Sequence, residues 1–213
     1  MKRTSAREFF DAVARRYDRD YALSGAASRE RMTRVLEAIR GKRRVLVLGI
    51  GTGRELPALL DAGHDVEGLD FSAEMIASCN KRSRTVPIVQ ADFWSQLPFP
   101  DARFDAAIAL HGTLAHPPDD AAIAALGAEL ARVLAPGGVF VAEVPAREAL
   151  DSMGVRRTGE TSFLHEDAAL GVALEGVALD AKSWIAALAP FEVAVTPLGA
   201  AEHLVVARRR ASI

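Results

Sequence analysis

Val45-Leu46-Val47-Leu48-Gly49-Ile50-Gly51-Thr52-Gly53-Arg54-Glu55 joins a short apolar run to three glycines at alternate positions. The apolar run predicts a strand that is buried on both faces, as in a parallel sheet. The glycines allow the backbone to turn sharply and a ligand to come into contact with it, and the amides that open the next helix would face that ligand. The sequence therefore predicts a strand–loop–helix unit with a small-molecule site at its loop.

Strands and helices alternate on both sides of this unit. The periodicity predicts strands over 64–69, 86–90, 104–110 and 139–144, and helices over 56–62, 72–80 and 121–134. Ser72 is expected to be the N-cap of its helix. Alternation at these lengths predicts one mostly parallel sheet with helices on both faces, an α/β fold.

The two ends of the chain differ from this pattern. Apolar residues at helical spacing predict helices over 6–20 and 28–40, before the first strand. Glycines without a clear period lead us to expect a loop-rich segment with short elements over 145–180. After a helix over 181–188, two strands over 191–196 and 203–208 are expected to form an antiparallel hairpin at the sheet end.

The composition is that of an ordinary globular enzyme. The chain has 213 residues with a formal net charge of −2, which fits a single domain over 1–213 and gives no basic face for nucleic acid. Its one cysteine, Cys79, forms no internal disulfide, and its histidines lack zinc-site spacing, so we expect no metal. No apolar run has signal-peptide or membrane-spanning length, and we expect a cytoplasmic protein without a membrane partner.

Asp70 closes the strand that follows the glycine loop, about 20 residues further on, where a carboxylate can accept both hydroxyls of a ribose. It could alternatively cap the helix that begins near Ser72. The dinucleotide fingerprint G-x-G-x-x-G would need glycine at Arg54 or at Leu56, so it is absent. The loop is a tighter form, with no pyrophosphate to accommodate.

With these motifs the chain resembles the class I S-adenosylmethionine (SAM)-dependent methyltransferases, and their small-molecule branch with type 11/25-like domains in particular. The resemblance extends from about Phe9 to Arg208 and includes Gln90-Ala91-Asp92-Phe93, Leu97–Asp105 and Leu130–Phe140, in the family's order and spacing. It implies a Rossmann-like fold with a seven-stranded, mostly parallel sheet whose last strand is antiparallel.

The resemblance also implies SAM as cofactor and S-adenosylhomocysteine (SAH) as product. Asp92 would meet the adenine amino group, although it could instead cap a turn. Tyr17 resembles an N-terminal tyrosine that folds over the SAM carboxylate, although it could belong to the core. The implied cofactor-binding residues are Tyr17, Gly49, Gly51 and Gly53 for the methionine part, Asp70 for the ribose, and Phe71, Met75, Asp92 and Phe93 for the adenine.

His111 directly follows the fourth strand, and ligands of open α/β sheets bind beyond the carboxyl ends of the strands. It is the candidate catalytic residue, since an imidazole is a suitable general base, and a candidate SAM contact through its backbone. It could also merely line the cleft. His116 falls where the family often carries a structural histidine. Glu143, Pro145 and His165 are expected to border the acceptor, and Glu143 could equally pair with an arginine.

The expected reaction is in-line transfer of a methyl group to an oxygen, nitrogen or carbon nucleophile of a small molecule. Residues 1–40 would form a lid and 145–180 a variable acceptor-side segment, in a monomer or a homodimer. Aminopropyl transfer, methylation of a protein side chain and SAM binding without catalysis remain alternatives. Amino-directed nucleic-acid enzymes carry Asn or Asp followed by Pro-Pro and an aromatic where this chain has His111–Leu114, so nucleic acid is not expected.

Overall fold

Strand β2 (Arg44–Leu48) lies at the centre of a seven-stranded sheet in the computed structural model, which describes residues 1–22 and 25–211. The sheet order is β10-β11-β6-β5-β2-β3-β4, and β11 is antiparallel to both of its neighbours while the pairs from β6 to β4 are parallel. This confirms the predicted fold class. The other strands are β3 (Asp65–Asp70), β4 (Ile88–Gln90), β5 (Phe104–Ala109), β6 (Leu134–Pro145), β10 (Phe191–Leu198) and β11 (Glu202–Arg209).

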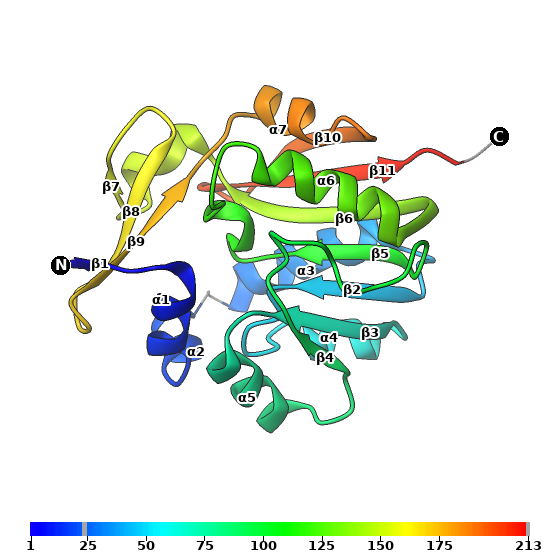
Figure 1. Ribbon diagram of the computed structural model, residues 1–213, viewed down its shortest axis with the longest axis horizontal. Helices are drawn as coiled ribbons and strands as arrows, with labels where there is room; N and C mark the ends of the chain where they lie inside the picture. Colours follow the sequence, from blue (N-terminus) through cyan, green and yellow to red (C-terminus); the bar gives the residue numbers. More distant parts are fainter. Residues whose placement is uncertain (23–24, 212–213) are drawn as a thin grey trace.

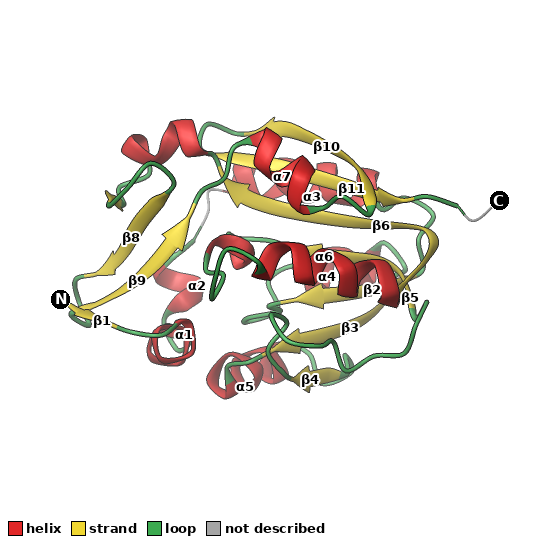
Figure 2. Ribbon diagram, turned by 45° about the horizontal axis from the view of Figure 1, so that its top comes forward, coloured by secondary structure: helices red, strands yellow, loops and turns green. Residues whose placement is uncertain are grey.

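Helices cover both faces of this sheet (Figures 1 and 2). Alternate residues of β2 point to opposite faces, so Leu46 and Leu48 join one core and Val45 and Val47 another. Helices α6 (Ala122–Val133) and α7 (Ala181–Ala187) cover the first face. The second face is covered by α3 (Gly25–Ala38), α4 (Leu56–Asp61) and α5 (Ala73–Arg82).

The C-terminal hairpin is confirmed, with strands slightly longer than predicted. Pro197 is paired within β10, and proline is tolerated there because β10 is the edge strand of the sheet. In the described ranges, no helix is long and apolar enough to span a membrane.

The single helix predicted over 6–20 is wrong, because the segment forms two helices. Helix α1 (Ala6–Val13) begins at Ser5, whose hydroxyl accepts from the Glu8 amide while the Glu8 carboxylate accepts from the Ser5 amide. After a break, α2 (Tyr17–Asp20) continues in a new direction. Residues 23–24 and 212–213, which the predicted domain includes, lie outside the described residues.

The segment over 145–180 has the short elements that were expected, but three of them form strands of a second sheet that the sequence analysis did not predict. After the 3-10 helix η2 (Arg147–Ser152), strands β7 (Arg156–Arg157), β8 (Ser162–Asp167) and β9 (Val172–Val177) form a second sheet. Strand β1 (Lys2–Arg3) pairs with β9, giving the order β1-β9-β8-β7. Gly176 is a strand residue that makes room for Phe163, since a Cβ there would lie 2.5 Å from the Phe163 ring.

Candidate functional site

All three glycines of the loop after β2 have positive φ angles, and Gly49 and Gly53 also lack room for a side chain. Gly49, Gly51 and Gly53 have φ angles of +60°, +53° and +75°, in the region that side chains rarely adopt. A Cβ at Gly49 would lie 2.6 Å from Thr113 Cγ2, and one at Gly53 would lie 2.6 Å from Cys79 Sγ. At Gly51 the nearest atom would be 3.9 Å away, so this glycine leaves its backbone open to a ligand.

Asp70 ends β3 beside this loop. Its carboxylate accepts from the Gly51 amide at 2.8 Å and from the Ser72 amide at 2.9 Å, and only 6% of the residue is exposed. Burial raises the pKa of Asp70, and the backbone hydrogen bonds from Ser72 and Gly51 offset part of that rise. Ser72 is the N-cap of α5, as predicted, and accepts from the Met75 amide. Asp70 thus connects the glycine loop to the start of the next helix.

A cavity of about 630 Å³ lies over the carboxyl ends of β2, β3 and β5, beneath α1 and α2. Gly53 and Asp92 do not line it; Asp92 Oδ1 accepts from the Trp94 amide at 3.0 Å, which is the turn contact that the sequence left as an alternative. The predicted residues that line this cavity are Tyr17, Gly49, Gly51, Asp70, Phe71, Met75, Phe93 and His111.

A second cavity of about 860 Å³ adjoins the first. It extends toward the small sheet and is lined by Glu143, Pro145 and His165, the residues expected to border the acceptor. Five residues line both cavities and mark where they meet: Phe10, Tyr17, Arg54, His111 and His116.

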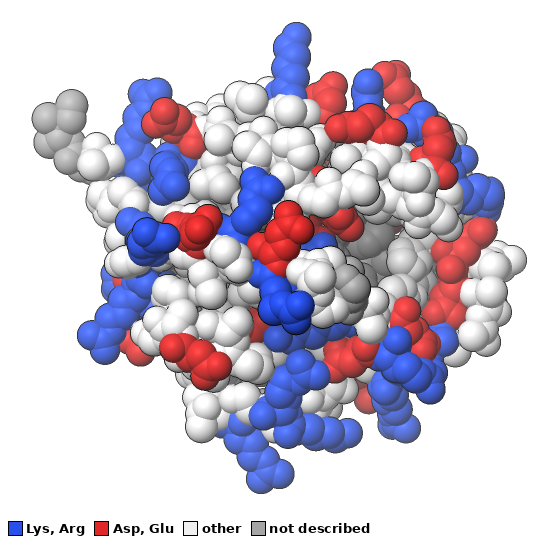
Figure 3. Space-filling model, turned by 180° about the vertical axis from the view of Figure 1, so that it is seen from behind, with Lys and Arg blue, Asp and Glu red and all other residues white. Residues whose placement is uncertain are grey.

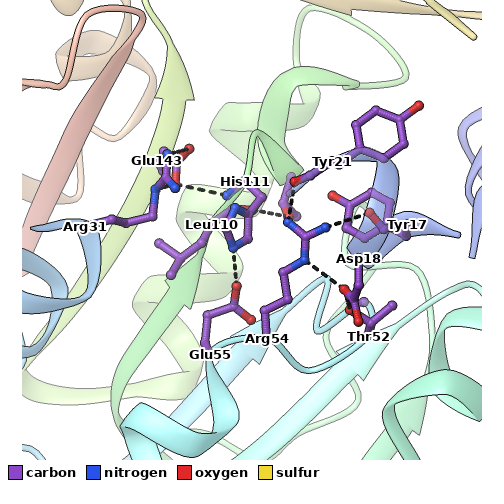
Figure 4. A network of polar contacts seen from close by, with 12 residues as sticks. Tyr17, Asp18, Tyr21, Arg31, Thr52, Arg54, Glu55, Leu110, His111 and Glu143 are labelled. Carbon is purple, nitrogen blue, oxygen red and sulfur yellow. Dashed lines mark hydrogen bonds and ion pairs between the residues drawn. The ribbon is translucent and has the colours of Figure 1, made fainter. Parts of the chain in front are cut away.

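His111 stands at this junction in a strained backbone conformation, with a φ of +56°. Its Nε2 forms an ion pair with Glu55, and its amide donates to Glu143 Oε2 at 3.2 Å (Figure 4). Burial acts to raise the pKa of Glu55, but the hydrogen bond and charge of His111 outweigh it and the pKa is lowered. Two buried carboxylates therefore hold His111 at the end of β5.

Glu143 does pair with an arginine, as the second interpretation of its sequence position allowed. Arg31 of α3 donates through Nη2 to Glu143 Oε1 at 2.8 Å, and its Nε forms an ion pair with the other carboxylate oxygen. Both residues are buried, with exposed fractions of 5% and 3%. The role of Arg31 could not be predicted from the sequence, because its partner lies 112 positions away.

Arg54 connects the glycine loop to the N-terminal helices. It donates to the backbone carbonyls of Tyr21 at 2.8 Å and Tyr17 at 2.9 Å, and forms an ion pair with Asp18 at 2.9 Å (Figure 4). Its guanidinium lies over the Tyr17 ring, 4.4 Å from the centroid. Asp18 also accepts from the Thr52 hydroxyl. Burial raises the pKa of Tyr17 to about 12, so this phenol stays protonated.

His116 has the structural contact that its sequence position suggested. Its Nδ1 lies 2.7 Å from the Glu175 carbonyl, which places the proton on that nitrogen. Burial lowers the pKa of His116 to about 4, so the ring is neutral near pH 7.

The described residues give no support to a metal site, and the face in Figure 3 gives none to a nucleic-acid-binding surface. Across residues 1–22 and 25–211, no three His, Cys, Asp or Glu side chains group as metal ligands would. On the face in Figure 3, Lys and Arg side chains are interspersed with Asp and Glu rather than gathered into one basic surface.

Comparison with known proteins shows that this chain is similar to methyltransferases. Residues 45–138 match the methyltransferase domain family. Trans-aconitate 2-methyltransferase of Acidovorax sp. (strain JS42) is 38% identical over 107 residues, which are 48% of this chain and 38% of the relative. Demethylmenaquinone methyltransferase of Renibacterium salmoninarum is 33% identical over 158 residues, which are 73% of this chain and 63% of the relative. The chain thus spans less than two thirds of the length of these curated relatives.

The fold has solved counterparts. The structure of the DhpI–SAH complex superposes with a TM-score of 0.75 at 23% identity, covering 96% of this chain and 95% of that one. At this identity the likeness shows the fold alone.

Proposed function

We propose that this chain is a class I SAM-dependent methyltransferase, which binds SAM and transfers its methyl group to an oxygen, nitrogen or carbon nucleophile of a small molecule. The observation that carries the proposal is the meeting of two cavities at His111, beyond the carboxyl ends of parallel strands. One cavity suits the donor and the other the acceptor, and a methyl transfer needs both to end at the same point.

The residues that line the first cavity suit the parts of SAM. Gly51 offers open backbone to the methionine part, and the Asp70 carboxylate suits the two ribose hydroxyls. The apolar side chains of Phe71, Met75 and Phe93 suit the adenine ring. Gly53 would act indirectly by shaping the loop, and Asp92 would reach the adenine only from outside the cavity lining.

Bound in this cavity, SAM would supply a methyl group on a sulfonium, and its S–CH₃ bond would break as the acceptor's lone pair takes the methyl and SAH remains. Tyr17, Arg54 and His111 would fix the line along which donor and acceptor meet. Where the acceptor carries a proton, His111 would remove it as general base and release it to water. Glu55 would orient the imidazole and stabilise its charged form, as a carboxylate partner does for a histidine base.

The N-terminal segment would close over the donor as a lid. Arg7 donates to the Phe71 carbonyl, and the Ser72 hydroxyl donates to Asp11 at 2.5 Å, which ties α1 to the adenine end of the cavity. Asp18 and Arg54 tie α2 to the glycine loop. Entry of SAM would require these contacts to break and re-form.

The test is SAH release in a screen of small-molecule acceptors, followed by kinetics of three variants. His111→Asn should lower kcat by about 10²-fold or more with an acceptor whose nucleophile carries a proton, with little change in the SAM Kd. Glu55→Gln should lower kcat, since the imidazole loses the carboxylate that orients it.

Glu148→Gln is the matched control. Glu148 forms the other histidine–glutamate pair, with His203 at 2.9 Å, and neither residue lines the first cavity. Activity and pH profile should be unchanged in this variant. Unchanged kinetics in His111→Asn would remove the role of His111 as base. SAM binding without SAH release from any acceptor would favour the non-catalytic alternative.

A further inference from the structure

The second cavity carries information about the acceptor. Resting on the proposed function, we propose that it takes an uncharged, planar aromatic acceptor whose hydroxyl or carbonyl oxygen accepts a hydrogen bond from Arg31 Nη1. Three independent features support this: the aromatic wall, the pairing of the charged groups and one unpartnered donor.

Aromatic side chains from two separate parts of the chain form the wall. Phe9, Phe10 and Tyr21 come from the N-terminal segment, and Phe163 and His165 come from β8. Their rings meet edge to face or tilted, with His165 at 5.5 Å from Phe9 and 5.3 Å from Tyr21 between centroids. Rings held in this way present apolar faces and edges to a flat aromatic guest.

The two histidines of the wall add no charge. Burial lowers the pKa of His165, and that of His116 lies at about 4 for the same reason. Both rings are therefore neutral near pH 7. They behave as part of the aromatic wall rather than as a site for an anion.

The charged groups of the lining compensate one another. Two arginines and two glutamates line the cavity: Arg31, Arg54, Glu143 and Glu202. Arg31 pairs with Glu143 and lies 3.9 Å from Glu202, while Arg54 is held by Asp18 and two backbone carbonyls. A carboxylate on the acceptor would be desolvated here without a free cation, which is costly, and an ammonium would find only Glu202, which Arg31 already contacts at 3.9 Å.

The guanidinium of Arg31, which lines this cavity, is not fully hydrogen-bonded. Arg31 Nη1 is buried and has no hydrogen-bond acceptor among the atoms of the described residues. A buried donor without an acceptor costs free energy, and an oxygen of the acceptor would satisfy it. Arg31 lies beside Glu143, whose other oxygen accepts from the His111 amide, so its guanidinium lies near the residues at which the two cavities meet.

The experiment is calorimetry on the full chain, first with SAH alone and then with aromatic probes added to the SAH-saturated protein. The probes share one ring system: 2-naphthol, 2-naphthoate, 2-naphthylmethylammonium and naphthalene. We expect 2-naphthol to bind at least about tenfold more tightly than either charged probe. Equal or tighter binding of a charged probe, or no binding of any probe, would overturn the inference. Absence of SAH binding would instead remove the proposed function itself.

Two variants probe the separate features. Arg31→Lys keeps a cation opposite Glu143 but removes Nη1, and should weaken 2-naphthol about fivefold while leaving naphthalene unchanged. Val155→Arg adds a cation to the wall and should bring 2-naphthoate level with 2-naphthol. Leu170→Arg adds the same charge at the exposed end of β8 and β9, outside the lining, and should leave every affinity unchanged. Equal behaviour of Val155→Arg and Leu170→Arg would overturn the charge argument.

Discussion

Gly49 and Gly63 show how the surroundings of a residue decide what a substitution does. Both have positive φ angles, +60° and +83°. A Cβ at Gly63 would meet nothing within 4 Å, whereas one at Gly49 would lie 2.6 Å from Thr113. The backbone strain is shared, and the steric conflict belongs to Gly49 alone of the two.

Gly63→Ala should therefore lower the free energy of unfolding by about 1 kcal/mol, the cost of a left-handed residue with a side chain. Gly49→Ala should lower it by about 3 kcal/mol, because crowding of a packed core adds to that strain. Urea denaturation followed by circular dichroism measures both. Equal losses in the two variants would contradict the close contact with Thr113.

His116 gives a prediction about pH. Its pKa is about 4 in the folded protein against 6.5 as the reference value, so the unfolded chain binds the extra proton between these pH values. Stability is then present above pH 6.5 and is lost as the pH falls toward 4. At pH 5 the loss from this residue is about 2 kcal/mol. Comparison of urea unfolding at pH 7.5 and pH 5 for the wild type and His116→Gln isolates it, and an identical fall in both proteins would refute the neutral ring.

Residues with a local signature could be predicted from the sequence. The Ser72 cap and the glycine loop depend on neighbours in the chain, and both were found. Glu55 follows the glycine loop in the sequence. Its role could not be predicted there, because it depends on contact with His111, which follows the separate strand β5. Arg31 lies on a helix face like many others, and only the folded chain brings it to Glu143.

The carboxylate of Asp167 connects strand β8 to the N-terminal helices. Asp167, at the end of β8, forms an ion pair with Arg16 and accepts from the Tyr21 hydroxyl at 3.2 Å. Strand β1 joins the same sheet by pairing with β9. The chain's first 21 residues and the small sheet are therefore linked at several points.

Asp167→Asn should loosen this connection, because the amide loses the charge that pairs with Arg16. Hydrogen exchange over residues 16–21 should become faster by about tenfold, while residues 44–48 of the central strand keep their rate. Glu166→Gln is the control, since Glu166 is the next residue and pairs with the exposed Arg156. The same exchange rates in Asp167→Asn and Glu166→Gln would contradict this connection.

Elements of the main sheet were predictable because strand and helix alternate with strong apolar patterns. The second sheet could not be predicted from such patterns. Its strands β1 and β7 have only two residues each, and glycines such as Gly176 and Gly171 were read as loop signals. Gly171 does form a turn, with a φ of +65°, but Gly176 is a packing position whose partner Phe163 lies on another strand.

At the scale of the whole molecule, the seven-stranded sheet brings the ends of β2, β3, β5 and β6 to one side, and the N-terminal helices and the small sheet lie over that side (Figure 1). Both cavities form there, one beneath α1 and α2 and the other toward β8. Because of this arrangement, the proposed donor and acceptor sites would meet beside His111 and the four other residues that line both cavities.

Calorimetric titration of the purified protein with SAM and SAH tests the central claim most directly, beside Asp70→Asn. The asparagine keeps one oxygen for the Gly51 and Ser72 amides but removes the charge that would hold the ribose. The account predicts micromolar binding of both compounds by the wild type and at least about tenfold weaker binding by the variant, which should stay folded. A folded wild-type protein that binds neither SAM nor SAH, or an Asp70→Asn variant that binds them equally well, would contradict it.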